Sequence, residues 1–241
     1  MKKIYFLFVA LLLTLGAGAQ TLRGDVNGDG TVDVADVTEL VDIILNGDKE
    51  EPDTPVVPEE PATDSRAIDL GLSVKWASCN VGATAPEEYG GYYAWGETEE
   101  KSSCYESNYL YYSNGSYTNI GSDISGTQYD VAHVKWGGSW RMPTKAEQDE
   151  LRNNCTWLWS TLNGVNGYRV TGPNGNSIFL PAAGSRYGTV VGRQGADGSY
   201  WSSSLLSSYS NIAYGLYFDG SGYVRGYSDR YLGLSVRPVS E

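Results

Sequence analysis

The chain has 241 residues and a net charge of −12, with 17 basic against 29 acidic residues. This balance excludes nucleic-acid binding through a basic face. The acidity is uneven, because residues 21–47 carry −5 and residues 48–64 carry −6. It therefore belongs mainly to an N-terminal arm.

The N-terminus, MKKIYFLFVALLLTLGAGAQ, has the order of a secretory signal peptide. Lys2 and Lys3 precede the apolar run 4–15, and the small residues 17–19 follow it. We expect residues 1–19 to form the signal and cleavage to follow Ala19. The run is too short to cross a bilayer. The mature chain is therefore expected outside the cell or on a bacterial surface, with no transmembrane segment.

Residues 24–48, GDVNGDGTVDVADVTELVDIILNGD, contain a twelve-residue loop with the spacing that calcium requires. Gly30 occupies the sharp turn. The predicted ligands are oxygens of Asp25, Asn27, Asp29, Thr31 (its carbonyl), Asp33 and Asp36. Four closely spaced carboxylates repel one another without a cation, so calcium is the expected cofactor.

The run 24–46 resembles one repeat of a type I dockerin, in which position 12 of the loop is Asp36. Dockerins have two such repeats and bind a cohesin, but a second loop is absent from this sequence. The following helix places Val37, Leu40, Val41, Ile44 and Leu45 on one face. This half-dockerin is therefore expected to meet the C-terminal domain, a second copy or a cohesin-like partner, or else to be a spacer.

Residues 48–65, with four prolines and seven acids, are predicted to be an extended linker. Residues 66–241 then form one domain rich in Gly, Ser and Tyr, in which short alternating runs predict mostly β structure. The last three runs, IAYGLYF, GYVRGY and GLSVRPV, predict an antiparallel meander. Alternation in the last run would turn Leu234 and Val236 inward and Ser235 and Arg237 outward.

One helix is predicted at 145–154, since Thr144 and Glu147 have the spacing of a capping box after Pro143. Trp76, Trp136, Trp140 and Trp201 are expected in the core. The three cysteines allow one disulfide. Because Cys104 lies in the Ser-rich stretch KSSCYESN, which is expected to be a mobile loop, a Cys79–Cys155 pairing is favoured among the three possible ones.

The order of AIDLGLSVKWASCNVGATAPEEYGGYYAWGE, WGGSWRMPTKAEQDEL, YWSSS and GLSVRPV resembles the Fibrobacter succinogenes major paralogous domain, from about Ile68 to Val239. That family is grouped with C-type lectin-like folds and also looks like the formylglycine-generating enzyme fold. The resemblance implies an α+β domain with short antiparallel strands, one main helix, adjacent termini and irregular loops that form a binding face.

Catalysis is not expected. The chain has no cysteine after Cys155, where formylglycine-generating enzymes use them, and a single histidine, His133, excludes a multi-histidine metal centre. Glycoside hydrolysis requires paired carboxylates, for which Glu97, Glu99, Asp197 and Asp219 are the candidates. The Glu-Pro-Asn and Trp-Asn-Asp signatures of calcium-dependent lectins are absent.

The sequence therefore predicts an exported, non-catalytic protein for ligand binding or adhesion, with an extracellular glycan or protein as ligand. The alternative is a part in extracellular polysaccharide degradation, by docking or through an unrecognised hydrolase site. Tyr, Ser, Gly and Asn crowd residues 105–119 and 185–231, as in adaptable recognition surfaces. The candidate contact residues are Tyr187, Tyr209, Tyr217, Tyr223, Arg225 and Tyr227.

Overall fold

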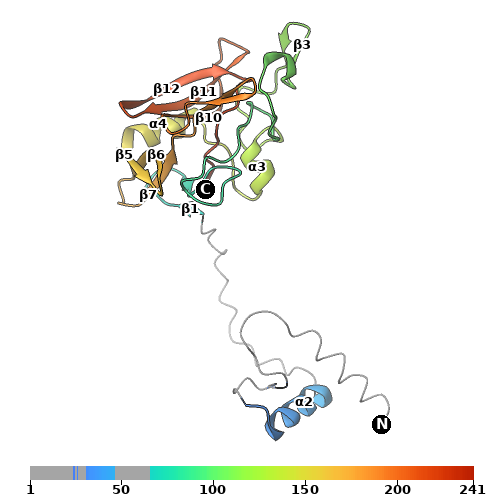
Figure 1. Ribbon diagram of the computed structural model, residues 1–241. Helices are drawn as coiled ribbons and strands as arrows, with labels where there is room; N and C mark the ends of the chain where they lie inside the picture. The colour runs from blue at the N-terminus through green and yellow to red at the C-terminus, as the bar shows by residue number, and fades with distance from the viewer. Residues whose placement is uncertain (1–23, 25, 27–30, 47–65) are drawn as a thin grey trace. The chain divides into compact units, whose positions relative to one another are not determined.

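The computed structural model describes Gly24, Val26, residues 31–46 and residues 66–241 (Figure 1). The predicted signal peptide (1–19), the linker (48–65) and three predicted calcium ligands, Asp25, Asn27 and Asp29, lie outside the described residues. Two compact units, Met1–Pro61 and Ala62–Glu241, divide the chain. Within the part that is described, no helix is long and apolar enough to cross a membrane.

In the first unit, the helix α2 (Val34–Asn46) follows the predicted calcium loop. Asp33 precedes the helix, and its Oδ1 accepts the Ala35 N–H at 2.7 Å. A carboxylate in this position satisfies one of the N–H groups that the first turn leaves without a partner. The helix expected after the loop is confirmed.

The second unit is built mainly from small antiparallel sheets with few helices. Its sheets are β1 (Ala67–Ile68), β2 (Lys75–Ala77) and β13 (Val239–Ser240); β3 (Tyr112–Ser113) and β4 (Ser116–Tyr117); β5 (Thr156–Leu162), β6 (Val165–Thr171) and β7 (Ser177–Pro181); β8 (Ser185–Tyr187) and β9 (Val190–Gly192); and β10 (Asp197–Leu205), β11 (Ile212–Asp219) and β12 (Gly222–Asp229). Because β2 pairs with both β1 and β13, the two ends of this unit are adjacent.

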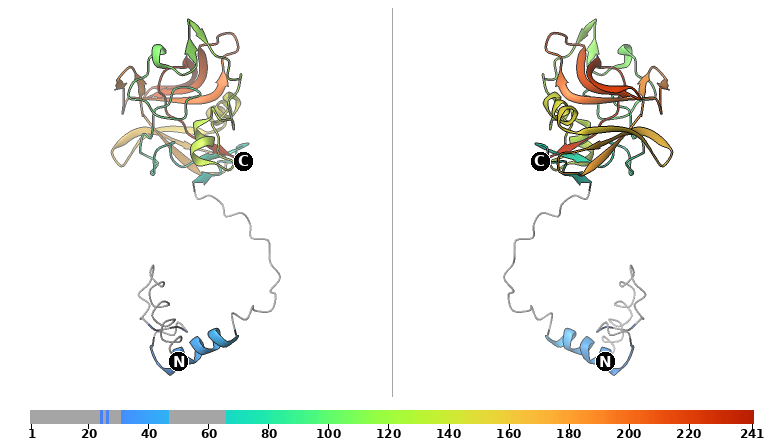
Figure 2. Two further views of the ribbon diagram at one scale, coloured as in Figure 1. Left: turned by 90° about the vertical axis from the view of Figure 1, so that its right-hand side faces the viewer. Right: turned by 90° about the vertical axis from the view of Figure 1, so that its left-hand side faces the viewer.

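The sheet β10–β11–β12 lies between two cores, and Figure 2 shows it stacked over the sheet β5–β6–β7. Its strands alternate, so that Tyr200, Leu216 and Phe218 join the first core, with side chains from β5–β7. Trp201 and Ala213 face the second core. Strand alternation therefore makes one sheet the common wall of both cores.

Three helices complete the unit: η1 (Glu106–Asn108), α3 (Val131–Trp136) and α4 (Lys145–Asn154). The helix predicted at 145–154 is confirmed together with its capping box. Thr144 Oγ1 accepts the Glu147 N–H at 3.2 Å, while Glu147 Oε2 accepts the Thr144 N–H at 2.7 Å. Local sequence determined this start, because both halves of the motif lie within four residues.

The predicted C-terminal meander is confirmed for two of its three strands. IAYGLYF and GYVRGY pair as β11 and β12, but the third strand of that sheet is β10 and not GLSVRPV. Residues 234–236 instead run between separate elements. Leu234 bridges to Tyr93, Ser235 bonds Ser199 and Trp201, and Val236 O accepts the Val81 N–H. Both sides of this segment are therefore enclosed, and the predicted outward direction of Ser235 and Arg237 is wrong, since both are buried.

The tryptophan prediction holds for Trp76, Trp140 and Trp201, which are buried. Trp136 is only half-buried; its ring lies 5.0 Å from that of Trp140 and 4.3 Å from the Arg66 guanidinium. These contacts place it at the edge of the domain and not in its core.

All three cysteines are free thiols in the structure, so the favoured Cys79–Cys155 pairing is not formed. The two sulfurs have separate surroundings: Cys79 donates to Ala83 O at 3.4 Å, and Cys155 packs against the first core. The assignment of Cys104 to a mobile loop is also wrong, because it is buried and bridges to Gly188. Burial raises the pKa of Cys104 and raises that of Cys155 to about 11.

Candidate functional site

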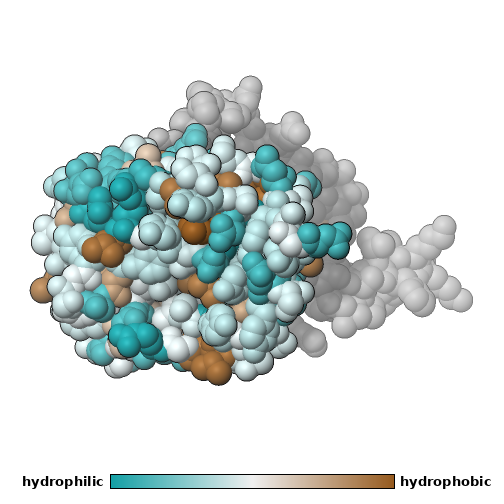
Figure 3. All heavy atoms as spheres, turned by 90° about the horizontal axis from the view of Figure 1, so that it is seen from above, coloured by the Kyte–Doolittle hydropathy of each residue, from teal (hydrophilic) through white to brown (hydrophobic). Residues whose placement is uncertain are grey.

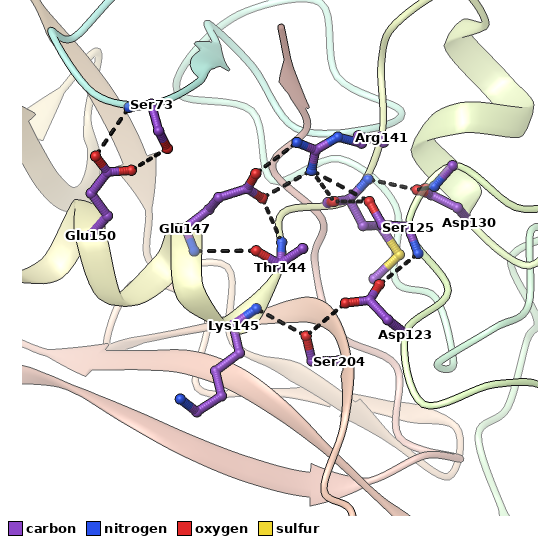
Figure 4. Close-up of polar contacts among 12 residues, drawn as sticks. Ser73, Asp123, Ser125, Asp130, Arg141, Thr144, Lys145, Glu147, Glu150 and Ser204 are labelled. Atoms are coloured by element: carbon purple, nitrogen blue, oxygen red, sulfur yellow. Dashed lines mark hydrogen bonds and ion pairs between the residues drawn. The ribbon is translucent and has the colours of Figure 1, made fainter.

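The motif WRMPTKAEQDEL forms a polar network that fixes the start of α4 (Figure 4). Arg141 binds both carboxylate oxygens of Glu147, at 2.9 and 2.6 Å. Burial would raise the pKa of Glu147, but the Arg141 guanidinium and the Thr144 N–H hold it below its usual value. The charged side chains of Arg141 and Glu147 therefore pair with each other and stabilise the start of α4.

Asp130, at the start of α3, extends this network. It is fully buried, and its carboxylate accepts four backbone N–H groups at 2.8–3.1 Å, those of Gly126, Ala132, His133 and Met142. Burial raises the pKa of Asp130 despite these donors. His133 contributes its backbone to this junction, which ties α3 to the strand-like segment before α4.

The motif GLSVRPV also contributes scaffold, through Arg237. Its three nitrogens Nε, Nη1 and Nη2 donate to Asn80 Oδ1, Ala77 O and Phe179 O at 2.8–3.0 Å. Burial lowers the pKa of Arg237. A charged group in the interior is tolerated when its donors are satisfied, so this arginine joins three separate segments.

The carboxylates considered for hydrolysis are largely paired with other groups. Glu97 is buried, accepts the Leu110 N–H and forms an ion pair with Lys101 at 2.8 Å, whereas the exposed Glu99 pairs with Lys135. Asp197 and Asp219 are cross-strand partners. Asp197 pairs with Arg193, and hydrogen bonds from Ser221 lower the pKa of Asp219.

The six candidate contact residues do not form one site. Tyr217 is half-buried against the second core, and its hydroxyl bonds Ser228 at 2.7 Å. Tyr223 stacks on Trp157, with ring centroids 4.4 Å apart, and packs against the first core. Both are scaffold residues. Arg225 pairs with Asp149 of α4 at 2.8 Å, and Tyr227, on the same face of β12, is exposed.

The other two candidates, Tyr187 and Tyr209, come from two further segments, the β8–β9 hairpin and the β10–β11 loop. Tyr187 belongs to the β8–β9 hairpin and is 62% exposed, opposite the exposed Val190. The Cys104–Gly188 bridge brings this hairpin beside residues 104–108, so that the rings of Tyr105 and Tyr187 lie 6.1 Å apart, edge to face. The two Tyr-rich stretches of the sequence thus meet in space.

Further tyrosines extend this contact. Tyr117 donates to Glu106 at 2.7 Å, and its ring lies 4.9 Å from that of Tyr112. Burial raises the pKa of Tyr231, and the neighbouring Asp229, Tyr187 and Glu106 raise it further. We call Tyr105, Tyr112, Tyr117, Tyr187 and Tyr231 the tyrosine surface.

Next to this surface is a hollow of about 650 Å³. Its lining residues are mainly small and polar: Asn119, Gly121, Ser122, Leu205, Ser207, Ser208, Ser210 and Arg230. We call it the serine hollow. Tyr209 lies between two lining serines, on the β10–β11 loop. The side chain of Arg230 joins hollow and tyrosine surface, because it bonds Ser210 O at 2.8 Å and lies 5.5 Å from the Tyr117 ring.

The view in Figure 3 looks down on the side that carries β12 and the β3–β4 hairpin. It shows mostly pale and teal groups, with isolated brown ones and no broad apolar patch. Such a surface suits a ligand held by ring contacts and hydrogen bonds more than a large hydrophobic protein interface.

The sequence pointed to the stretch that contains Tyr105, Tyr112 and Tyr117 but did not single these residues out. It missed Arg230 and the serine hollow altogether. Arg230 follows a strand in an ordinary turn sequence, SDRYL, and nothing local shows that the chain will bury it.

The described part of the predicted calcium site is the segment before and within the first turn of α2. Asp36 is 3% exposed, and its carboxylate accepts the Val26 and Asp33 N–H groups, each at 2.7 Å. The structure thus brings Asp33 and Asp36 together. Among the described residues no cluster of three or more His, Cys, Asp or Glu is poised to bind a metal.

No protein-family model, curated protein or solved structure gives a match to this chain.

Proposed function

We propose that residues 66–241 are a non-catalytic recognition domain with a C-type lectin-like fold, which binds carbohydrate outside the cell. The observation that carries this proposal is the tyrosine surface beside the serine hollow. Tyr105 and Tyr187 come from separate segments, yet their rings meet at 6.1 Å and remain exposed. A pair of rings that folding brings together and leaves in solvent indicates a contact surface.

Carbohydrate suits this surface for two physical reasons. Tyrosine rings offer flat apolar area for the C–H faces of a sugar, at a low cost in conformational entropy. Serine hydroxyls and the Asn119 amide both donate and accept hydrogen bonds, as do the hydroxyls of a sugar. The engagement of Glu97, Glu99 and Asp197 in ion pairs supports a binding role in preference to hydrolysis.

A glycan array probed with the mature protein tests the proposal. On the glycan that binds best, replacing Tyr105 and Tyr187 together by Ala is expected to weaken affinity by about 1–3 kcal/mol, because both rings lose their contact area. Isothermal calorimetry measures the change.

Tyr227→Ala is the matched control, since this tyrosine is 61% exposed but lies on β12. It is expected to leave the affinity unchanged. Equal losses in the double variant and in this control would contradict the assignment, as would release of reducing sugar from the bound glycan.

We also propose that the N-terminal repeat binds calcium through Asp25, Asn27, Asp29, Thr31, Asp33 and Asp36. The position of the Asp36 carboxylate supports this, since the backbone N–H groups of Val26 and Asp33 hold it within the loop, each at 2.7 Å. Bound calcium would offset the mutual repulsion of the carboxylates. Val37 and Val41, 54% and 46% exposed, suit the helix to contact a cohesin-like partner or a second copy.

Calcium uptake tests the proposed loop directly. Asp25→Ala with Asp29→Ala is expected to abolish it, because two of the four carboxylate ligands are lost. The control is Asp48→Ala with Asp53→Ala, which makes the same change in charge after the loop. Calorimetry that finds equal uptake by both double variants would rule the loop out.

The signal-like residues 1–19 place the protein, in this proposal, outside the cell or on its surface. N-terminal sequencing of the secreted chain is expected to begin at Gln20. A chain that retains Met1 in the cell interior would contradict export.

A further inference from the structure

We propose that the serine hollow is a subsite for a carboxylate group, so that the domain prefers acidic glycans that contain uronic acid residues. This inference rests on the proposed carbohydrate binding and specifies the class of sugar. It depends on the state of Arg230, the one charged residue among those that line the hollow.

The Arg230 side chain is held rigidly below the surface, with 1% exposure. Nε donates to the Tyr109 hydroxyl at 2.8 Å, and Nη1 donates to Ser210 O and Thr118 O at 2.8 and 3.2 Å. Ser210 and Asn119, the residue after Thr118, both line the hollow. The guanidinium is therefore fixed against the wall of the hollow.

The hydrogen bonding of Arg230 is incomplete. Its Nη2 is buried and has no acceptor among the residues that the structure describes. A buried donor without an acceptor costs about 1–3 kcal/mol, and native proteins contain few of them. The protein therefore supplies only part of the acceptors that this guanidinium can use, unlike that of Arg237.

The charge of Arg230 is also not neutralised by the protein. No Asp or Glu of residues 66–241 forms an ion pair with it. The adjoining Asp229 accepts hydrogen bonds from Asn211 and Tyr231. Rings of Trp95, Tyr109 and Tyr117 lie 4.9–5.5 Å from Cζ and stabilise the cation, but they leave its charge in place.

This arrangement favours an anion in the hollow. The charge is removed from water, so its field is screened less than that of an exposed arginine. No acidic residue lines the hollow, although the protein carries −12. A negatively charged group in the hollow is therefore attracted by Arg230, and no carboxylate in the lining repels it.

The remaining lining offers hydrogen bonds that suit a sugar. Four serines and Asn119 provide hydrogen-bonding groups for a polyhydroxylated ring, while Leu205 is the one apolar side chain in the lining.

The test compares an oligogalacturonate with the same oligosaccharide after its carboxylates are reduced to hydroxymethyl groups. The wild-type protein is expected to bind the acidic form about tenfold more tightly, by an amount that falls as salt is added. Amide chemical-shift changes at Asn119, Ser122 and Ser210 are expected with the acidic probe.

The diagnostic variant is Asn119→Asp, because it places a negative charge in the hollow and preserves the local turn. Asn119 Oδ1 accepts the Gly121 N–H at 2.9 Å, and a carboxylate oxygen accepts the same bond. We expect the variant to lose about tenfold in affinity for the acidic probe and little for the reduced one. Asn153→Asp, an exposed position on α4, is the control and is expected to change neither.

Equal affinity of the wild type for the two probes would overturn the inference, as would equal effects of Asn119→Asp and Asn153→Asp, or no binding by either probe. A polyglutamate peptide that competes as well as the oligogalacturonate would assign the hollow to protein ligands and overturn it too. If the two probes bind equally well and binding depends on Tyr105 and Tyr187, the proposed carbohydrate binding stands and the carboxylate subsite does not. Shifts at Asn119, Ser122 and Ser210 with oligogalacturonate that persist unchanged in the Tyr105→Ala, Tyr187→Ala double variant would support the hollow and contradict the tyrosine surface as the main contact.

Discussion

Arg237 and Arg230 are the two fully buried arginines of the described residues, each 1% exposed, and their surroundings differ in one respect. Three protein oxygens accept hydrogen bonds from all three nitrogens of Arg237. Arg230 has Nη2 left over and lies against an open hollow. In this pair, at equal burial, hydrogen bonding is complete for Arg237 and incomplete for Arg230, which lies beside the hollow.

The same contrast, between internally bonded and exposed side chains, distinguishes two regions of the domain. Arg141 and Glu147 of WRMPTKAEQDEL and Arg237 of GLSVRPV make their hydrogen bonds inside the domain. The tyrosine surface comes from stretches with little local pattern. Distinctive motifs therefore mark the scaffold of this domain, and the candidate site lies elsewhere.

The largest expected effect is on stability, at Arg237. Arg237→Met leaves three buried acceptors without donors and is expected to lower the free energy of unfolding by about 3–5 kcal/mol. Urea denaturation measures this. Arg169→Met, an exposed position on β6, is the control and should stay within about 0.5 kcal/mol. A tolerated Arg237→Met would remove the distinction between the two arginines.

Tyr223 and Tyr227 allow a comparison of a packed and an exposed side chain within one strand, β12. Tyr223→Ala removes the stack on Trp157 and is expected to cost about 2–3 kcal/mol of unfolding free energy. Tyr227→Ala, at a 61% exposed side chain, is expected to change it by less than about 0.5 kcal/mol. Similar melting curves for the two variants would return Tyr223 to the set of surface residues.

The smallest of these effects depends on pH. Glu147→Gln retains the capping box but loses the ion pair with Arg141, at an expected cost of about 1–2 kcal/mol near neutral pH. Because the folded-state pKa of Glu147 lies below 4.5, its contribution is present above that value and is lost as pH falls through the folded pKa. The difference between wild type and variant should therefore shrink below about pH 4.5.

The control for this prediction is Glu99→Gln, since the Glu99 side chain is 79% exposed and its pair with Lys135 is screened by solvent. Urea titrations at several pH values compare the two variants. A difference for Glu147→Gln that stayed constant from neutral to acidic pH would show that the ion pair does not supply the stability.

The sequence by itself determined the features that depend on nearby residues. The capping box of α4, the helix after the predicted calcium loop and the β11–β12 hairpin each follow from groups within a few positions of one another. The antiparallel, mainly β character of residues 66–241 likewise follows from short alternating runs between turn residues.

Only the tertiary structure decided the rest. Alternation predicted an exposed Arg237, but residues 234–236 pass between segments that cover both sides, so alternation has no solvent face to select. In the same way, Trp157 buries Tyr223 from a distant strand, and the Cys104–Gly188 bridge brings Tyr105 to Tyr187. Arg230 acquires its role from Trp95, Tyr109, Thr118 and Ser210, which lie 20 or more residues away in sequence. Contacts between remote residues set burial, and burial determines whether a polar group is part of the scaffold or of a site.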